Sequence, residues 1–154
     1  MHEGILCKIQ SSNTIRYEER YLELFRIAWN NQVINRGKIN QWFAVGDDDT
    51  VWFINNMLRV LQQYNSSSTI YLGGISDKTS QVQRHGVYFA YGGGGIILSR
   101  PLALLFSTYT EKCKQYLSMF GGDEMIGKCV TEILKVRLTK SNKFHQMDHR
   151  GDMT

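Results

Sequence analysis

A short apolar run followed at once by three carboxylates constrains this chain more than any other stretch. Residues 42–45 are apolar and stop at Gly46, a pattern that predicts a buried strand and its end. Asp47, Asp48 and Asp49 come next, at the carboxyl end of the strand, where open α/β sheets place their ligands. Because adjacent carboxylates repel one another, a hard divalent cation that arrives with phosphate oxygens is one partner for them. The alternative is a solvated acidic turn that caps the next helix.

Helices and strands alternate along the rest of the chain. Apolar residues recur at helical spacing in four segments, which begin at Tyr17, Phe53, Pro101 and Asp123, the last residue being the expected N-cap of its helix. The predicted strands and buried segments cover residues 69–72, 87–91, 96–98 and 136–138, and the predicted loops cover 30–40 and 76–83. This alternation indicates the α/β class. At 154 residues with no linker, we expect one domain over 1–154.

Charge and hydropathy exclude several partners. The net charge of +4 is mild, and the basic residues near the C-terminus are typical of a solvated face. No nucleic-acid-binding motif accompanies them, so we expect no nucleic-acid partner. No apolar run approaches the length of a membrane-spanning helix, and the first residues lack the pattern of a signal peptide. We therefore expect neither an anchor nor a secretory signal in this chain.

Two further groups could carry chemistry. Residues 92–95 are four glycines that match neither the Walker phosphate loop nor the dinucleotide-binding pattern. They predict a close approach of the backbone to another group, or else a flexible or strained turn. Asp123 lies at a predicted helix N-terminus, where the helix dipole favours an ionised carboxylate that can accept a proton. Plain helix capping is the alternative for Asp123.

Two of the cysteines and one glycosylation pattern also carry information about the fold and the compartment. Cys113 and Cys129 fall on the apolar faces of successive predicted helices, so they are core thiols or a disulfide. Their wide spacing excludes a structural zinc site with His145 and His149. We expect the two sulfurs to face each other, bonded or nearly so, and a bridge would stabilise the fold by roughly 3 kcal/mol. The sequence from Asn65 to Ser67 is an N-glycosylation sequon, which has meaning only in the secretory pathway.

Five motifs in a fixed order carry a resemblance to a known family. They are Trp-Phe-x-x-Gly-Asp-Asp-Asp-Thr, Tyr-x-Gly-Gly, Tyr-Gly-Gly-Gly-Gly-x-x-x-Ser-x-Pro-Leu, Gly-Gly-Asp-Glu-Met-Ile-Gly-Lys-Cys and Phe-His-Gln-Met-Asp-x-x-Gly-Asp. Over residues 17–153 the chain resembles the fringe-like glycosyltransferases of family 31. The similarity is greatest to the branch known from plants and fungi as a domain of unknown function.

This resemblance implies a GT-A fold, in which the first strands, those that hold the nucleotide base, are expected to be incomplete before Tyr17. It implies a hexosyltransferase that moves a sugar from a UDP-sugar donor to a hydroxyl of a glycan or glycoprotein acceptor, with inversion and in β1,3 linkage. It also implies Mn²⁺ or Mg²⁺ as cofactor and the Golgi as compartment, where full-length relatives are membrane-anchored. The alternative is a non-catalytic paralogue that keeps the fold as a binding or remnant domain.

The resemblance also assigns roles to single residues. Asp47, Asp49 and His145 correspond to the metal site, and Asp49 is the best candidate for direct coordination. Asp47 and Asp48 also contribute to donor binding, together with Gly92, Gly93, Gly94 and Gly95, which line the sugar pocket. Asp123 corresponds to the catalytic base, whereas its neighbour Glu124 is expected to point elsewhere.

Overall fold

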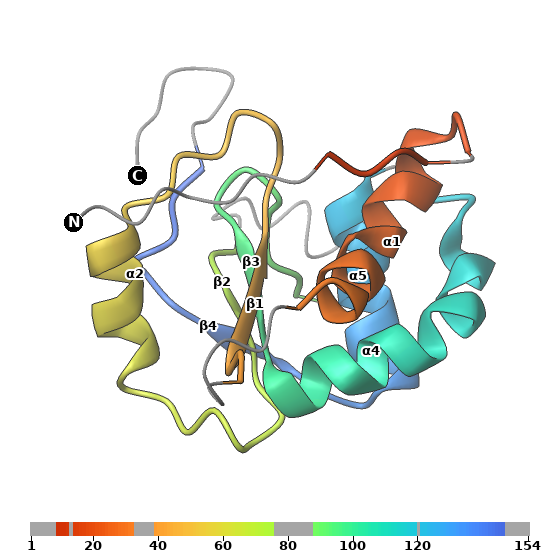
Figure 1. Ribbon diagram of the computed structural model, residues 1–154. Coiled ribbons are helices and arrows are strands. Elements are labelled where there is room, and N and C mark those ends of the chain that lie inside the picture. The colour runs from red at the N-terminus through yellow and green to blue at the C-terminus, as the bar shows by residue number, and fades with distance from the viewer. Residues whose placement is uncertain (1–8, 13, 33–38, 76–87, 120, 147–154) are drawn as a thin grey trace.

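A four-stranded mixed sheet forms the centre of the part of the protein that the computed structural model describes, which is residues 9–12, 14–32, 39–75, 88–119 and 121–146 (Figure 1). The strands lie in the order β1-β3-β2-β4. They are β1 (Trp42–Val45), β3 (Ile96–Ser99), β2 (Tyr71–Gly73) and β4 (Leu138–Lys140). Both β1 and β2 are antiparallel to β3, whereas β4 is parallel to β2. The α/β prediction is confirmed.

Helices cover both faces of this sheet (Figure 1). One side carries α1 (Tyr17–Asn30), α4 (Arg100–Cys113) and α5 (Gly122–Lys128), and the other carries α2 (Ile54–Leu61). Side chains alternate between the faces along a strand, so Ile96 and Leu98 of β3 join the larger core and Ile97 joins the smaller one. A central strand buried on both faces explains the unbroken apolar run in this part of the sequence.

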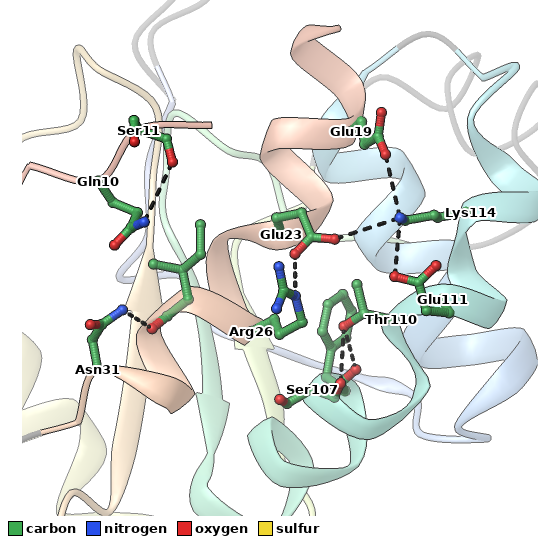
Figure 2. Close-up of polar contacts among 12 residues, drawn as sticks. Gln10, Ser11, Glu19, Glu23, Arg26, Asn31, Ser107, Thr110, Glu111 and Lys114 are labelled. Atoms are coloured by element: carbon green, nitrogen blue, oxygen red, sulfur yellow. Dashed lines mark hydrogen bonds and ion pairs between the residues drawn. The ribbon is translucent and has the colours of Figure 1, made fainter. Parts of the chain in front are cut away.

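Helices α1 and α4 are joined by aromatic packing and by a charged cluster. The rings of Phe25 and Phe106 meet edge to face, with centroids 5.4 Å apart. Beyond the end of α4, the Lys114 ammonium lies 3.3 Å from Glu19, 3.0 Å from Glu111 and 3.9 Å from Glu23 (Figure 2). Glu111 is exposed, Lys114 and Glu19 are partly exposed and Glu23 is buried, so solvent screens part of this cluster and the pairs add to the apolar packing between α1 and α4.

The expected contact between Cys113 and Cys129 is confirmed. The two residues form a disulfide with Cα atoms 5.2 Å apart, and both are fully buried. The bond links the end of α4 to the π-helical turn Cys129–Ile133 that continues α5. It therefore fixes α5, which carries Asp123, to the rest of the helical layer.

Several predicted elements differ from the structure. Residues 88–91, predicted to be strand, form no ladder, although Phe89 and Ala90 are buried. The hydrophobicity of this segment predicted its burial but not the hydrogen-bond partners of its backbone. The Ala90 N–H donates to the Tyr71 hydroxyl, and the Tyr91 N–H donates to the Gly74 carbonyl.

Element boundaries account for the remaining corrections. Asp123 is not the N-cap, because α5 begins one residue earlier and Gly121 caps it. The last strand covers residues 138–140 rather than 136–138. Phe53 precedes α2 and is 71% exposed, so the face predicted for that helix is only partly buried. Residues 76–83, most of the 30–40 segment and His149 lie outside the described residues. Within the described ranges, no helix has the length and apolar content that crossing a membrane requires.

Candidate active site

The turn Gly92–Gly95 is the point where the predicted site residues meet. It precedes β3, and the Gly95 N–H closes it by donating to the Gly92 carbonyl at 2.9 Å. Gly95 has a φ of +88°, in the left-handed region that favours glycine. The Gly92 N–H donates to Oδ2 of Asp123 at 3.2 Å, and the Thr50 hydroxyl donates to the Gly92 carbonyl at 3.3 Å. One residue thus connects the acidic turn after β1 with the start of α5.

Within this turn, Gly92 is the residue that side chains of other elements approach most closely. A Cβ on this residue would lie 2.7 Å and 2.8 Å from the two carboxylate oxygens of Asp47, and it would collide with the Tyr21 hydroxyl. The prediction that the glycine run admits a close neighbour is confirmed here. The Asp47 carboxylate, the Asp123 carboxylate and the Tyr21 hydroxyl therefore surround a single glycine.

Asp123 lies in the first turn of α5. Its Oδ1 accepts a hydrogen bond of 2.8 Å from the Glu124 N–H, and Gly121 before the helix has a φ of +112°. Burial raises the pKa of the Asp123 carboxyl, the nearby Asp47 raises it further, and the N–H groups of Gly92 and Glu124 oppose both effects. No described ion pair includes Asp123. A carboxylate with a raised pKa is a stronger proton acceptor, which suits a general base.

Tyr21 and Tyr17 belong to this site, and the sequence reasoning did not assign them to it. Tyr21 is 5% exposed. Its hydroxyl has no partner at hydrogen-bond geometry among the described residues, but it lies beside Asp47. Burial raises the pKa of the Tyr21 phenol, and the charges of Asp47 and Asp123 raise it further. Tyr17, with its ring centroid 5.7 Å from that of Tyr21, is half exposed and has its pKa raised by burial and by the same two charges. Helical periodicity marked both residues as apolar positions and carried no signal for their hydroxyls.

The other predicted residues lie around the same turn. Asp48 and Asp49 are exposed, next to Asp47. The backbone of His145 passes Gly94, where an added Cβ would be 3.4 Å from the His145 carbonyl oxygen. Among the residues described, no three or more His, Cys, Asp or Glu side chains form a group that could hold a metal ion. The structure thus brings together Asp47, Asp123 and Gly92, whereas Asp49 and His145 are near the turn without forming a ligand set.

Comparison with known proteins identifies the family. Residues 7–153 match the sequence profile of the family described as "Fringe-like". The chain belongs to the fringe-like family.

Three relatives illustrate the similarity. Beta-1,3-N-acetylglucosaminyltransferase lunatic fringe of Gallus gallus is 30% identical over 120 residues, which cover 68% of this chain and 33% of that protein. Beta-1,3-glucosyltransferase of Mus musculus is 33% identical over 108 residues, covering 68% of this chain and 20% of that protein. Fringe glycosyltransferase of Drosophila melanogaster is 29% identical over 121 residues, covering 68% and 29%. The fringe-like chain therefore spans a third or less of the length of these relatives.

The donor atoms of the acidic turn suit a hard cation. Magnesium is usually bound through one or two carboxylates plus substrate phosphates, rather than by a cage made of protein alone. Exposed Asp48 and Asp49 beside Asp47 provide such carboxylates at the end of β1. The acidic turn therefore offers the type of ligand that such a cation takes, while the described residues form no cluster of three ligands.

Proposed function

We propose that this fringe-like domain belongs to a metal-dependent inverting hexosyltransferase. In this proposal a sugar passes from a UDP-sugar to a hydroxyl of a glycan or glycoprotein, in β1,3 linkage, in the Golgi lumen or at its membrane. The relatives support the reaction class, since they are β1,3-N-acetylglucosaminyl- and β1,3-glucosyltransferases. The observation that carries the proposal is the convergence of Asp47 and Asp123 on Gly92.

Asp123 is the proposed general base. Inversion requires the acceptor hydroxyl to attack the anomeric carbon from the side opposite the departing diphosphate, and one carboxylate must take the hydroxyl proton there. The Asp123 carboxylate is held by the Gly92 and Glu124 N–H groups, and its raised pKa strengthens it as a base. Both hydrogen bonds orient the carboxylate while leaving it free of any described ion pair.

Asp47, Asp48 and Asp49 are proposed to bind the diphosphate end of the UDP-sugar donor. Asp47 and Asp49 of the acidic turn would hold Mn²⁺ or Mg²⁺, which would supply positive charge against the diphosphate. His145 would join them as a third ligand only after a rearrangement, because no three of the described residues form a ligand group. The turn Gly92–Gly95 presents main chain without side chains beside these carboxylates, so a donor sugar can approach the backbone closely. Tyr17, half exposed beside the same acidic residues, offers an aromatic face at the edge of the site.

Calorimetry tests the donor site. We expect UDP to bind the 154-residue chain in the presence of Mn²⁺ and to lose that binding in Asp49→Ala or when the metal is chelated. Glu111→Gln is the matched control, because it removes an exposed carboxylate on α4 that belongs to the Lys114 cluster. UDP affinity that is equal with and without Mn²⁺ would refute the metal-dependent donor site.

A transfer assay separates the enzyme from a binding domain. Asp123→Asn keeps the shape of the side chain but cannot accept a proton, and loss of a general base lowers rates about 10²–10⁴-fold. We expect this loss of sugar transfer together with unchanged metal-dependent UDP binding. Transfer that persists in Asp123→Asn would exclude the base assignment. Retained UDP binding without transfer in the wild-type chain would favour the non-catalytic alternative.

A further inference from the structure

The sequence contains one Asn-x-Ser/Thr sequon, and the structure places it on an exposed turn. Helix α2 ends at Leu61, and Asn65 and Ser67 are both exposed before β2 begins at Tyr71. The Ser67 N–H donates to Oδ1 of Asn65 at 3.0 Å, and the Ser68 N–H donates to the Asn65 carbonyl at 3.0 Å. Nδ2 of Asn65 makes no described hydrogen bond, so the amide nitrogen is available to an external reagent.

The disulfide provides independent evidence for the compartment in which a sequon is used. Disulfides form and persist in oxidising compartments, above all along the secretory pathway, and are rare in the cytosol. The bond between Cys113 and Cys129 is fully buried and joins two helices of the core. A chain that folds around such a bond meets the machinery of N-glycosylation during the same stage of its synthesis.

The sheet topology places Asn65 and the candidate active site at opposite ends of the strands. Because β1 and β2 are both antiparallel to β3, they run in the same direction. Asp47 follows the carboxyl end of β1, whereas Asn65 precedes the amino end of β2 (the yellow-green segment below α2 in Figure 1). Its neighbours Gln62, Gln63 and Ser68 are exposed and polar. A bulky hydrophilic group there would lie at the opposite end of these strands from the acidic turn that follows β1.

We propose that Asn65 is an N-linked glycosylation site and that the glycan leaves the active site open. The inference rests on the secretory localisation within the proposed function. In the transfer, a bond forms between Nδ2 of Asn65 and C1 of an oligosaccharide. The bond from C1 to the phosphate oxygen of a lipid diphosphate breaks, the lipid diphosphate leaves with the electron pair, and a base of the transferring enzyme takes the Nδ2 proton.

The test uses the full chain behind a cleavable secretory signal in cultured animal cells. We expect a glycosidase specific for N-linked glycans to lower its mass, and mass spectrometry to find Asn65 converted to Asp. Asn65→Gln and Ser67→Ala should both abolish the shift, by different chemical changes. Asn142→Gln is the matched control, because Asn142 is also exposed but has no Ser or Thr two residues later, and it should retain the shift.

Two outcomes overturn the inference. One is wild-type protein that carries the Cys113–Cys129 disulfide, and so has passed the oxidising compartment, but has no glycosidase-sensitive mass. The other is a shift that survives in Asn65→Gln. Neither readout depends on UDP or on catalysis, so failure of UDP binding would refute the proposed enzyme and leave the glycan assignment standing. If the glycan leaves the active site open, the glycosylated wild type and Asn65→Gln should bind UDP with equal affinity. A weaker affinity of the glycosylated form would contradict the claim that the site stays open.

Discussion

A methyl group added at Gly92 should damage the site, whereas the same group added at Gly94 in the same turn should not. At Gly92 the new Cβ would lie 2.7 Å from Oδ1 of Asp47 and would also collide with the hydroxyl of buried Tyr21. At Gly94 its nearest neighbour is the His145 carbonyl oxygen at 3.4 Å, an ordinary contact. Neither glycine has a positive φ, so alanine adds no backbone strain at either position.

Comparing Gly92→Ala with Gly94→Ala isolates the loss of stability caused by the close packing around Gly92. Both substitutions restrict the unfolded chain equally, which stabilises the fold by about 0.4–1 kcal/mol in each case. Overpacking in a tight environment opposes this gain by about 1–3 kcal/mol, and only Gly92→Ala incurs it. Gly92→Ala should therefore be about 1–3 kcal/mol less stable than Gly94→Ala. For a domain of this size that difference corresponds to roughly 2–12 °C in Tm.

Guanidinium and thermal denaturation measure the difference in stability, and calorimetry measures its effect on the site. The Asp47 side chain, at the partly exposed turn, can rotate away from a new methyl group, so Gly92→Ala should weaken Mn²⁺-dependent UDP binding more than Gly94→Ala does, because the methyl group at Gly94 does not meet Asp47. Because the Tyr21 hydroxyl is one of the two obstacles, Gly92→Ala should cost less in a Tyr21→Phe background, a coupling expected only for neighbours. Equal stabilities of the two alanine variants, or strict additivity with Tyr21→Phe, would refute the packing described around Gly92.

Three further predictions concern charges and the disulfide. Burial raises the pKa of Asp123 in the fold, so the contribution of this carboxyl to stability is present below its ordinary pKa and is lost as pH rises through the raised value. Asp123→Asn should therefore increase the free energy of unfolding at pH 7, with a smaller gain at pH 3. Urea denaturation that shows no gain at pH 7 would contradict this. Replacing both Cys113 and Cys129 by Ala should lower the free energy of unfolding by about 3 kcal/mol, because the bridge spans 16 positions, and calorimetric melting in oxidising buffer measures the loss. Lys114→Met should cost about 1 kcal/mol, and less in 1 M salt, because solvent and ions screen the pairs with Glu19 and Glu111 more than the pair with buried Glu23. A loss well above about 1 kcal/mol that salt does not reduce would contradict this.

Local signals in the sequence were sufficient for the periodic elements and for naming two of the candidate site residues. The strand at 42–45, the helix from Tyr17 and the Cys113–Cys129 contact each follow from apolar spacing, and all three are confirmed. Asp47 and Asp123 were candidates because acidic residues directly follow a strand or open a helix. Their proximity was implied by the family resemblance, since no local pattern relates a turn after β1 to the start of α5.

What the sequence could not provide were contacts made by single atoms. Segment 88–91 has the composition of a strand, but its backbone groups bind a tyrosine hydroxyl and a carbonyl instead of a neighbouring strand. Tyr21 occupies an apolar position of α1, so its spacing predicts burial of the ring and leaves the destination of the hydroxyl open. Both cases depend on tertiary geometry at the scale of one side chain, which periodicity does not encode.

The position of Tyr21 suggests how the two carboxylates keep their separation. A Cβ on Gly122 would collide with the base of the Tyr21 ring, and a Cβ on Gly92 would collide with its hydroxyl. The ring therefore spans from the residue before Asp123 to the residue that contacts Asp47. A buried tyrosine has only two side-chain torsions, so it is a stiff spacer compared with the aspartates. The Tyr21 ring between Gly92 and Gly122 thus holds the two carboxylates close together, in a position that burial disfavours for charged groups. An unfavourable local arrangement of this kind is typical of sites retained for chemistry rather than for stability.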